Sequence, residues 1–593
     1  MVYGGKPSRG CRTCRTRRIK CDEAKPTCKR CEKSKRECLG YRPEFEIVHR
    51  DQNRSTVRRM RRAVSQQRQQ QQQQYEDESQ SLSYLLTPSH SPPPHLFQSS
   101  SRQTLSPSPV PAPTTPIGQR ATCHFASNFI LVPLDGHAHG FMDYLVPLLG
   151  AEPPESALSY AFSSCALALL GNRSRADNVD LAKRSLKEHT LALARTHAAL
   201  GDPATATADA TLAAVMMLCL YESITAVKES RMLAWRSHIM GALQIVKSRG
   251  REEMYRTKTG TILFNAVRHQ LISRTLSAGI PPPLGVDWWM QGGDTDSLPA
   301  VCQLFSLKTG ELRAEVAHLL TGISRTAESI EILLEMSQRV RSLDHDIATW
   351  LASIPPESCP RTLCWMWDDE IDLSQGTKSY SEVAVFPGRV DIYPDLVTAN
   401  TWNIARVARL LLASLSIRIT GWVSSPMGYH NTTEYTTSQR ISEGAITDII
   451  ASIPYHLGWH TKQHMRGMSH DSNSEHSGFA CGEDAPTKAL PGLFLIWSLT
   501  CIKNFDLSTE EQRAWAKGRL RFIEEQVGLK YARIVNDVDF RFPSMMIRQD
   551  RLKEGLDPLK GHSSGLPLRL KVVLQTPMTP ESLDYVERSP SPE

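Results

Sequence analysis

The chain has 593 residues, of which 40% are hydrophobic and 22% are charged, and it carries a formal net charge of +7. This composition is typical of a soluble globular protein with some disordered segments, and it excludes a wholly disordered chain. The most apolar stretch, residues 211–221, is too short to cross a bilayer, so we expect a buried core helix there and no membrane partner. Residues 1–40 contain no apolar run of the kind that a secretory signal needs, which favours a reducing compartment.

The charge is distributed unevenly along the chain. Residues 1–62 contain 20 Lys and Arg against 7 Asp and Glu, a balance of +13. The remaining residues contain 49 basic and 55 acidic side chains, a balance of −6. A short, strongly basic segment at one end predicts a module that binds a polyanion such as nucleic acid.

The same basic segment holds a cluster of six cysteines. Their spacing is a two-fold repeat, because three cysteines are followed by three more at the same intervals. In a reducing compartment such a cluster favours metal binding over disulfides. Thiolates select zinc, and a structural zinc ion takes four ligands in a tetrahedron. We therefore predict a zinc site formed by Cys11, Cys14, Cys21, Cys28, Cys31 and Cys38.

The number of sulfurs predicts how many ions are bound. One zinc ion would leave two cysteines unused, whereas two ions need eight ligand places and the module contains no histidine. Two sulfurs must then bridge both ions, and the symmetry of the repeat makes Cys11 and Cys28 the simplest choice. Mixed Cys/His fingers lack their histidines, and an iron–sulfur cluster would not use this repeat. We expect two structural zinc ions per chain, with every ligand place filled and no water activated for catalysis.

The module resembles the fungal zinc binuclear cluster DNA-binding domain. All six cysteines match the family spacing, as do the basic stretch "CRTRRIKC" and the "KP" before the fourth cysteine. The resemblance implies that Cys11 and Cys28 are the bridging ligands and that Lys25 and Pro26 lie in a loop between two short helices. It also implies that the first helix enters the DNA major groove, typically at a CGG triplet.

Four basic residues after Cys14 are the candidate DNA contacts. Arg18 matches the position that the family uses to read a base, where lysine is more common, and arginine can donate to guanine O6 and N7. Arg15, Arg17 and Lys20 are better candidates for phosphate contacts or support. The second half of the module, with Lys29, Arg30, Lys33 and Lys35, is in the family more often directed at the DNA backbone.

The predicted DNA-binding module covers residues 1–45, and two linker segments follow it. Residues 46–65 are basic and contain a possible helix, and the patch 58–62 is a candidate nuclear localisation signal or phosphate contact. Apolar residues in this segment do not repeat at heptad spacing, so a zipper is not supported, and monomeric binding or dimerisation elsewhere both remain open. Residues 66–120 are rich in Gln, Ser and Pro, and we expect a disordered tether because such a composition buries too little apolar area.

A large helical region is predicted from residue 121 to 570, before a disordered Ser/Thr-Pro tail at 571–593. Apolar residues at helical spacing indicate several early helices before Gly250, and later ones around 310–352, 396–418, 437–453, 488–503 and 508–526. No alternating β pattern is evident, so the fold class is mostly α. Residues 234–250, 390–412 and 508–534 look like segments of the fungal-specific transcription factor regulatory domain.

These features favour a DNA-binding regulator of transcription and not an enzyme. The chain contains no nucleophile elbow, P-loop, dinucleotide fingerprint or zinc-protease motif. For the aromatic and acidic stretch 364–373 we favour a loop packed by its tryptophans over an exposed activation motif. The resemblance implies a nuclear protein that acts with RNA polymerase II on a metabolic or secondary-metabolite gene set. Its expected partners are double-stranded DNA and the transcription machinery, and a second copy of the chain is a further candidate partner. The alternative is an enzyme, or a metal or redox sensor, that carries a zinc DNA-targeting module.

Overall fold

The computed structural model describes twelve segments of the chain. They are residues 11–17, 19–24, 27–36, 38, 115–132, 140–173, 178–226, 230–292, 294–367, 379–424, 428–459 and 487–553. The predictions for residues 46–65, most of the tether and the tail at 571–593 lie outside these residues. The chain divides into two compact units, Met1–Val110 and Pro111–Glu593, and each is described by itself.

The first unit contains two short helices, one from each half of the cysteine repeat. They are α1 (Arg12–Thr16) and α2 (Lys29–Lys33). Cys28 is the N-cap of α2, because its sulfur accepts the N–H of Cys31. Each half of the repeat thus starts a helix at its first cysteine, and this places the second cysteine of that half on the first turn.

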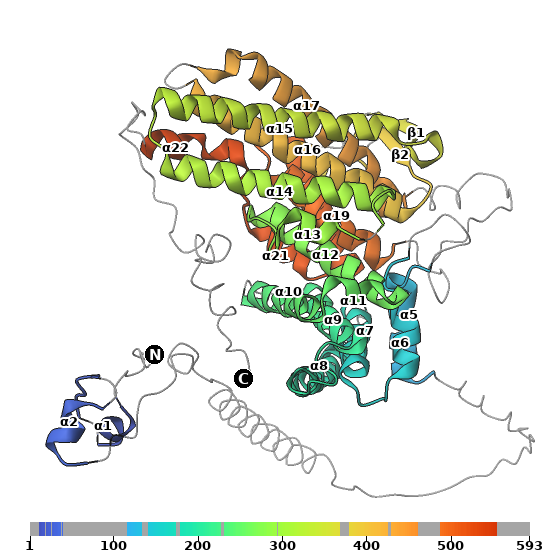
Figure 1. The fold of residues 1–593 in the computed structure, drawn as a ribbon. Helices are drawn as coiled ribbons and strands as arrows, with labels where there is room; N and C mark the ends of the chain where they lie inside the picture. The colour runs from blue at the N-terminus through green and yellow to red at the C-terminus, as the bar shows by residue number, and fades with distance from the viewer. Residues whose placement is uncertain are drawn as a thin grey trace, which may run out of the picture. The chain divides into compact units, whose positions relative to one another are not determined.

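The second unit is a large assembly of helices (Figure 1). Its first part contains α5 (Ile117–Phe129), α6 (Leu145–Ala151), α7 (Ala157–Arg173), α8 (Asn178–Gly201), α9 (Asp209–Thr225), α10 (Ser230–Arg249), α11 (Arg251–Tyr255), α12 (Lys258–Ala278) and α13 (Gly285–Met290). Its second part contains α14 (Leu298–Gly322), α15 (Ala327–Ser353), α16 (Leu396–Val423), α17 (Thr433–His456), α19 (Ala489–Asn504), α20 (Glu510–Phe522), α21 (Tyr531–Asp537) and α22 (Ile547–Lys553). Single turns of tighter or wider helix are η1 (Pro356–Ser358), η2 (Tyr380–Glu382), η3 (Tyr429–Asn431), η4 (Ile523–Val527) and η5 (Pro543–Met546).

The helix starts follow the capping chemistry of the sequence. The side chains of Ser297, Thr326, Asp395 and Thr432 each accept the N–H of the residue three positions later. At α20, Thr509 and Gln512 form a reciprocal capping box. These caps satisfy N–H groups that have no partner inside the helix.

The core lies around helices that are apolar on every side. Helix α9 is buried along almost its whole length, as the sequence predicts for residues 211–221. The long helices α14, α15 and α17 pack against α16 (Figure 1), and a second apolar cluster fills the space between α14, α15 and α16. Such all-round apolar helices are stable only inside a larger assembly. Among the described helices, none combines the length and the apolar character needed to cross a bilayer.

Two predictions about this unit are wrong in detail. Helix α5 begins at Ile117, inside the segment predicted as tether, and buries Ala121, Phe125 and Phe129 on one face. The Pro-rich run leads directly into this helix, whose N-cap Pro116 makes no side-chain cap, so no start signal is visible. The unit also contains a hairpin of β1 (Arg361–Met366) and β2 (Gly388–Ile392), paired antiparallel.

The hairpin also corrects the prediction for the aromatic stretch. Trp365 lies on β1 and is 57% exposed, and Trp367 directly after the strand is 63% exposed. These tryptophans therefore do not pack the segment from inside. The physical reason is the pairing of β1 with β2, which orients alternate side chains of the strand outwards.

Candidate metal centre and nucleic-acid interface

The six cysteines of the first unit come together in space. Their sulfurs form two overlapping sets of four, each with all its sulfurs within 4.8 Å of one another. The first set is Cys11, Cys14, Cys21 and Cys28, and the second is Cys11, Cys28, Cys31 and Cys38. The two members common to both sets are Cys11 and Cys28, which is the pair that the symmetry of the spacing selects.

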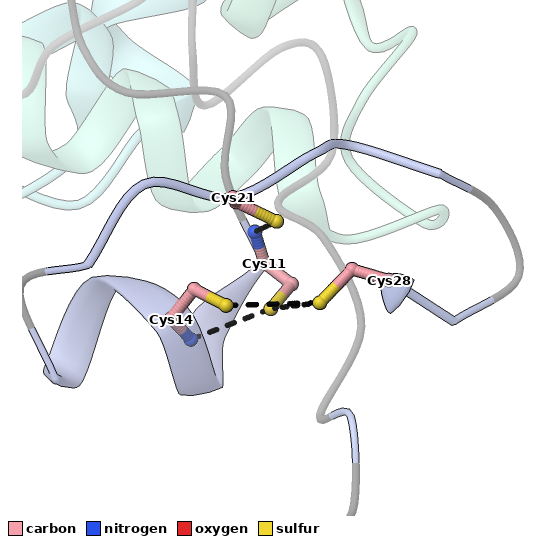
Figure 2. Close-up of side chains that lie close together, drawn as sticks. All are labelled: Cys11, Cys14, Cys21 and Cys28. Carbon is pink, nitrogen blue, oxygen red and sulfur yellow. Dashed lines mark hydrogen bonds between the residues drawn. The ribbon is translucent and has the colours of Figure 1, made fainter. Parts of the chain in front are cut away.

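The distances between the sulfurs fit shared tetrahedral coordination. Cys28 Sγ lies 3.6 Å from Cys11 Sγ and 3.6 Å from Cys14 Sγ, and Cys11 Sγ lies 3.8 Å from Cys31 Sγ. A tetrahedron with zinc–sulfur bonds of about 2.3 Å has sulfur–sulfur edges of about 3.8 Å. Figure 2 shows the sulfurs of Cys11, Cys14 and Cys28 directed toward one another beside α1. The donor set therefore has the chemistry and the spacing that zinc requires.

Backbone N–H groups surround the sulfurs. The Cys14 N–H donates to Cys11 Sγ at 3.4 Å, and the Cys31 N–H donates to Cys28 Sγ at 3.3 Å. The Cys11 N–H donates to Cys21 Sγ at 3.4 Å. These donors favour the thiolate form of the three sulfurs and fix their directions.

The electrostatics of the cluster call for a cation. Burial raises the pKa of the Cys11 thiol to about 12, and burial also raises the pKa of Cys14 and of Cys28. Thiolates crowded in one buried cluster repel one another, so they need a compensating positive charge to ionise together. Divalent metal supplies that charge, and metal binding to such thiols releases their protons.

Asp22 is a functional residue that the sequence analysis missed. Its carboxylate accepts the N–H of Lys29 at 3.1 Å and the N–H of Arg30 at 3.3 Å. It thereby satisfies the start of α2 from the opposite half of the repeat and ties the two halves together. The feature of the sequence that could have identified Asp22 is its acidic side chain directly after Cys21 in a strongly basic segment.

Seven basic side chains of the module are exposed among those that the structure describes. They are Arg17, Lys20, Lys29, Arg30, Lys33, Lys35 and Arg36. Of the predicted DNA contacts, Arg15 lies in α1, Arg17 follows it in a turn, and Lys20 lies beyond the helix. Arg18, together with Lys25 and Pro26, lies outside the described residues. Helix α1 ends at Thr16, so Arg17 and Lys20 are not part of it.

The early end of α1 has a physical cause. The Ile19 N–H bonds to the carbonyl of Cys14, five residues back, which closes a wider turn than an α-helix. The chain then turns so that Cys21 Sγ accepts the N–H of Cys11. The helix thus ends at Thr16, two residues after Cys14, and the chain after it brings Cys21 to the other sulfurs.

Comparison with known proteins agrees with this geometry. Residues 9–46 match the model of the fungal Zn(2)-Cys(6) binuclear cluster domain, and residues 123–360 match that of the fungal specific transcription factor domain. The second match runs from α5 to the turn before β1. No solved structure gives a significant match.

Curated relatives match in shorter segments. White-opaque regulator 2 of Candida albicans is 60% identical over 47 residues, which is 8% of this chain and 10% of that protein. Transcription factor dbaG of Emericella nidulans is 30% identical over 125 residues, 21% of this chain and 27% of that protein. The aspercryptin biosynthesis cluster-specific transcription regulator atnN of Emericella nidulans is 54% identical over 39 residues, 7% of this chain and 6% of that protein. The chain thus covers about a quarter or less of the length of these relatives.

One of the two matched models and the names of dbaG and atnN refer to transcription factors or regulators, and none of these names refers to an enzyme. The order of the two matches is also the order that the sequence predicts, with the cysteine module before the helical region. The chain therefore combines a fungal Zn(2)-Cys(6) binuclear cluster domain with a fungal specific transcription factor domain.

Proposed function

We propose that this chain is a nuclear, sequence-specific DNA-binding regulator of transcription by RNA polymerase II. The observation that carries the proposal is the pair of overlapping four-sulfur sets within a module whose described basic side chains are exposed. A cluster that fixes two short basic helices presents charge to DNA in a defined arrangement, which a disordered basic tail does not.

Two zinc ions would be held by the six thiolates, with Cys11 and Cys28 shared. The common membership of these two residues in both sulfur sets supports the count. Bound zinc would supply only structure here, since every ligand place is filled by protein sulfur. Asp22 and the N–H groups of Cys14 and Cys31 orient the halves of the module around the sulfurs.

The reading of DNA would begin at the first half of the module. Arg18 is the residue that we assign to guanine in a CGG-type site, with Arg15, Arg17 and Lys20 on phosphates or in support. Arg17 and Lys20 are exposed, which supports their assignment. Bidentate contact with guanine adds about 1–3 kcal/mol of discrimination, whereas phosphate contacts carry no sequence information.

We assign the helical unit to regulation without catalysis, and the C-terminal tail to the transcription machinery. The names of relatives such as the aspercryptin cluster regulator support a role in a metabolic or secondary-metabolite gene set. Whether the chain binds DNA alone or as a homodimer is decided by the spacing of half-sites in bound sequences.

Binding to two duplexes tests the proposal. The full chain is titrated with a CGG-containing duplex and with a scrambled duplex of the same composition at matched salt. We expect the unmodified chain to prefer the CGG duplex, Arg18→Ala to remove most of that preference, and Arg18→Lys to keep it. Arg36→Ala, a matched loss of one exposed charge in the second half, should weaken both complexes alike. Equal affinity of the unmodified chain for both duplexes would contradict sequence-specific binding.

A further inference from the structure

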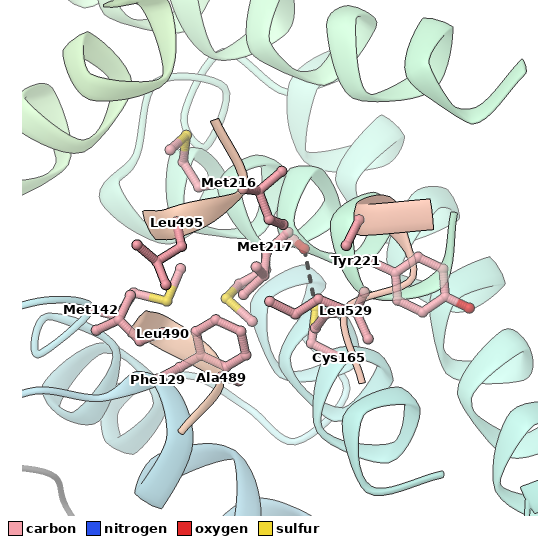
Figure 3. Packing of buried hydrophobic residues seen from close by; sticks show 14 of the residues in the cluster. Phe129, Met142, Cys165, Met216, Met217, Tyr221, Ala489, Leu490, Leu495 and Leu529 are labelled. Atoms are coloured by element: carbon pink, nitrogen blue, oxygen red, sulfur yellow. Dashed lines mark hydrogen bonds between the residues drawn. The ribbon is translucent and has the colours of Figure 1, made fainter. Parts of the chain in front are cut away.

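A cavity of about 200 Å³ lies inside the helical unit. Its lining residues come from helices that are far apart in the sequence, namely α9, α10, α12, α16, α19 and α21. Most of its lining is apolar, and it includes Met142 and Met216, which are labelled in Figure 3. Ligand sites in proteins are typically such apolar cavities with a few polar groups directed into them.

Two arginines bring positive charge to this cavity. Arg274 on α12 is only 7% exposed, and Arg236 on α10 is partly buried. Within the described part of the chain, neither guanidinium has an acceptor in a hydrogen bond or ion pair, and no Asp or Glu lines the cavity. Burial, together with the nearby charge of Arg236, lowers the pKa of Arg274 to about 10, so the Arg274 side chain remains charged at neutral pH.

Several other buried arginines of the unit have acceptors, although Arg519, which is 6% exposed, has no hydrogen-bond acceptor among the described residues either. Arg173 donates to the carbonyls of Val527 and Thr487, and Arg268 donates to the carbonyl of Trp289. A buried cation without such partners is costly, because its lost hydration is not replaced. The cost at Arg274 would be removed by an anion held in the cavity.

Further polar groups border the same space. Asn400 on α16 is 7% exposed, and its side-chain amide makes no hydrogen bond within the described residues. Nε1 of Trp497 on α19 is buried and likewise has no acceptor among them. His269 adds no charge, since burial lowers its pKa to about 4. The available groups are therefore mostly donors, as recognition of an anion requires.

We propose that this cavity binds a small, mainly apolar organic carboxylate. Arg274 and Arg236 would pair with the carboxylate, Asn400 and Trp497 would complete its hydrogen bonds, and the body of the ligand would pack against the apolar wall. Sites for drug-sized ligands typically have volumes of about 300–1,000 Å³. The volume of this cavity is smaller, which favours a small acid. Inorganic phosphate would leave the apolar part of the cavity unfilled. This proposal is independent of the proposed DNA binding. The cavity lies in the helical unit, and ligand binding is measured without DNA.

A pair of isosteric probes tests the proposal. The full chain is titrated in a calorimeter with octanoate and with the neutral octanamide, and the carboxylate series from hexanoate to decanoate is measured alongside. We expect one saturable site that prefers octanoate over octanamide by at least about ten-fold, because hydrogen bonds to a charged group are worth about 1.5–3 kcal/mol. Arg274→Gln should reduce the preference to about two-fold or less, and Arg236→Gln should reduce it in part.

Two further variants separate the site from the rest of the unit. Ala278→Phe fills part of the cavity and should weaken the binding of both probes. Arg339→Gln, which removes an exposed ion pair between α15 and α14, should change the binding of neither. If Arg274→Gln does not fold by circular dichroism, Arg236→Gln decides the result. Equal affinity for both probes, a preference unchanged by the arginine variants, or no saturable binding across the carboxylate series would overturn the proposal.

Discussion

Arg418 on α16 and Asp550 on α22 form a buried ion pair across 132 residues of sequence. The guanidinium donates through Nε and one terminal nitrogen at 2.8 and 2.9 Å, and the two side chains are 8% and 3% exposed. This pair fixes the last described helix against the long helix α16. Its geometry is bidentate, which is the form in which such pairs are strongest.

We expect Asp550→Ala to lower the free energy of unfolding by roughly 3–5 kcal/mol, because it leaves the Arg418 charge buried without a partner. Urea unfolding followed by circular dichroism measures the change. Glu315→Ala breaks the exposed pair with Arg339 and should cost less than about 1 kcal/mol. The double variant Arg418→Met with Asp550→Leu should recover most of the loss in stability. Equal losses for Asp550→Ala and Glu315→Ala would contradict the prediction.

A close backbone approach makes Gly518 on α20 intolerant of any side chain. A Cβ at this position would overlap the carbonyl oxygen of Ser381 in η2, which is backbone and cannot rotate away. We expect Gly518→Ala to destabilise the unit by roughly 1–3 kcal/mol, as forced overpacking does. Gly444→Ala on α17 is the matched control, since a Cβ there meets nothing within 4 Å, and it should stabilise by up to about 1 kcal/mol. Thermal unfolding measures both changes in stability. If Gly518→Ala and Gly444→Ala change the stability in the same direction, the contact with Ser381 has no effect.

Loss of a shared sulfur should harm the metal centre more than loss of a terminal one. Cys28 belongs to both sulfur sets and Cys38 to one, so we expect Cys28→Ser to lose close to two equivalents of zinc and Cys38→Ser to retain more. Metal analysis of the purified full chain measures the difference. Chelation should abolish DNA binding and leave most helical signal intact, because no second cluster of metal ligands occurs among the residues that the structure describes. Equal zinc loss in both variants would argue against bridging.

The stability of the helical unit should fall in mild acid because of a partly buried neutral histidine. His124 on α5 has Nε2 buried without a partner, and burial, together with Arg173 and Lys488, lowers its pKa to about 4. An unfolded histidine has a pKa of about 6.5, so the unfolded state binds more protons between about pH 6.5 and 4. The free energy of unfolding therefore decreases as the pH falls through this window. His124→Gln should make that slope shallower without removing it, since His269 has a pKa of about 4 as well, whereas His345→Gln at an exposed site should leave it unchanged.

The sequence predicts the metal ligands and most long helices because each depends on local pattern. Chelation fixes the spacing of the six cysteines, and apolar periodicity marks segments such as α16 and α19. The hairpin is not evident from the sequence, because β1 and β2 are separated by 21 residues and the apolar side chains of β1 are partly exposed. The predicted helical region 310–352 covers the second half of α14 and nearly all of α15, since the break between the two helices is marked only by the N-cap Thr326.

The cavity and the anchoring role of Asp22 depend on contacts distant in sequence. Arg236 on α10 and Arg274 near the end of α12 are separated in sequence by helix α11, and their lack of a counter-charge is visible only when six helices are assembled. Asp22 caps a helix that starts seven residues later, across a loop. No spacing rule applied to the linear chain identifies either feature.

The last prediction separates phosphate contact from base contact at Arg17. Arg17 is exposed in the turn after α1, directly before the residue that we assign to guanine. Each phosphate neutralised by a protein cation contributes a slope of about −0.9 to the plot of log affinity against log salt. We expect Arg17→Gln to make this slope shallower by about 0.9 for the CGG and the scrambled duplex alike, and to leave the ratio of the two affinities unchanged. Arg339→Gln, on α15 of the helical unit, should leave both slopes as they are. A changed ratio with an unchanged slope would instead assign Arg17 to base reading, because only base contacts discriminate between the two sequences.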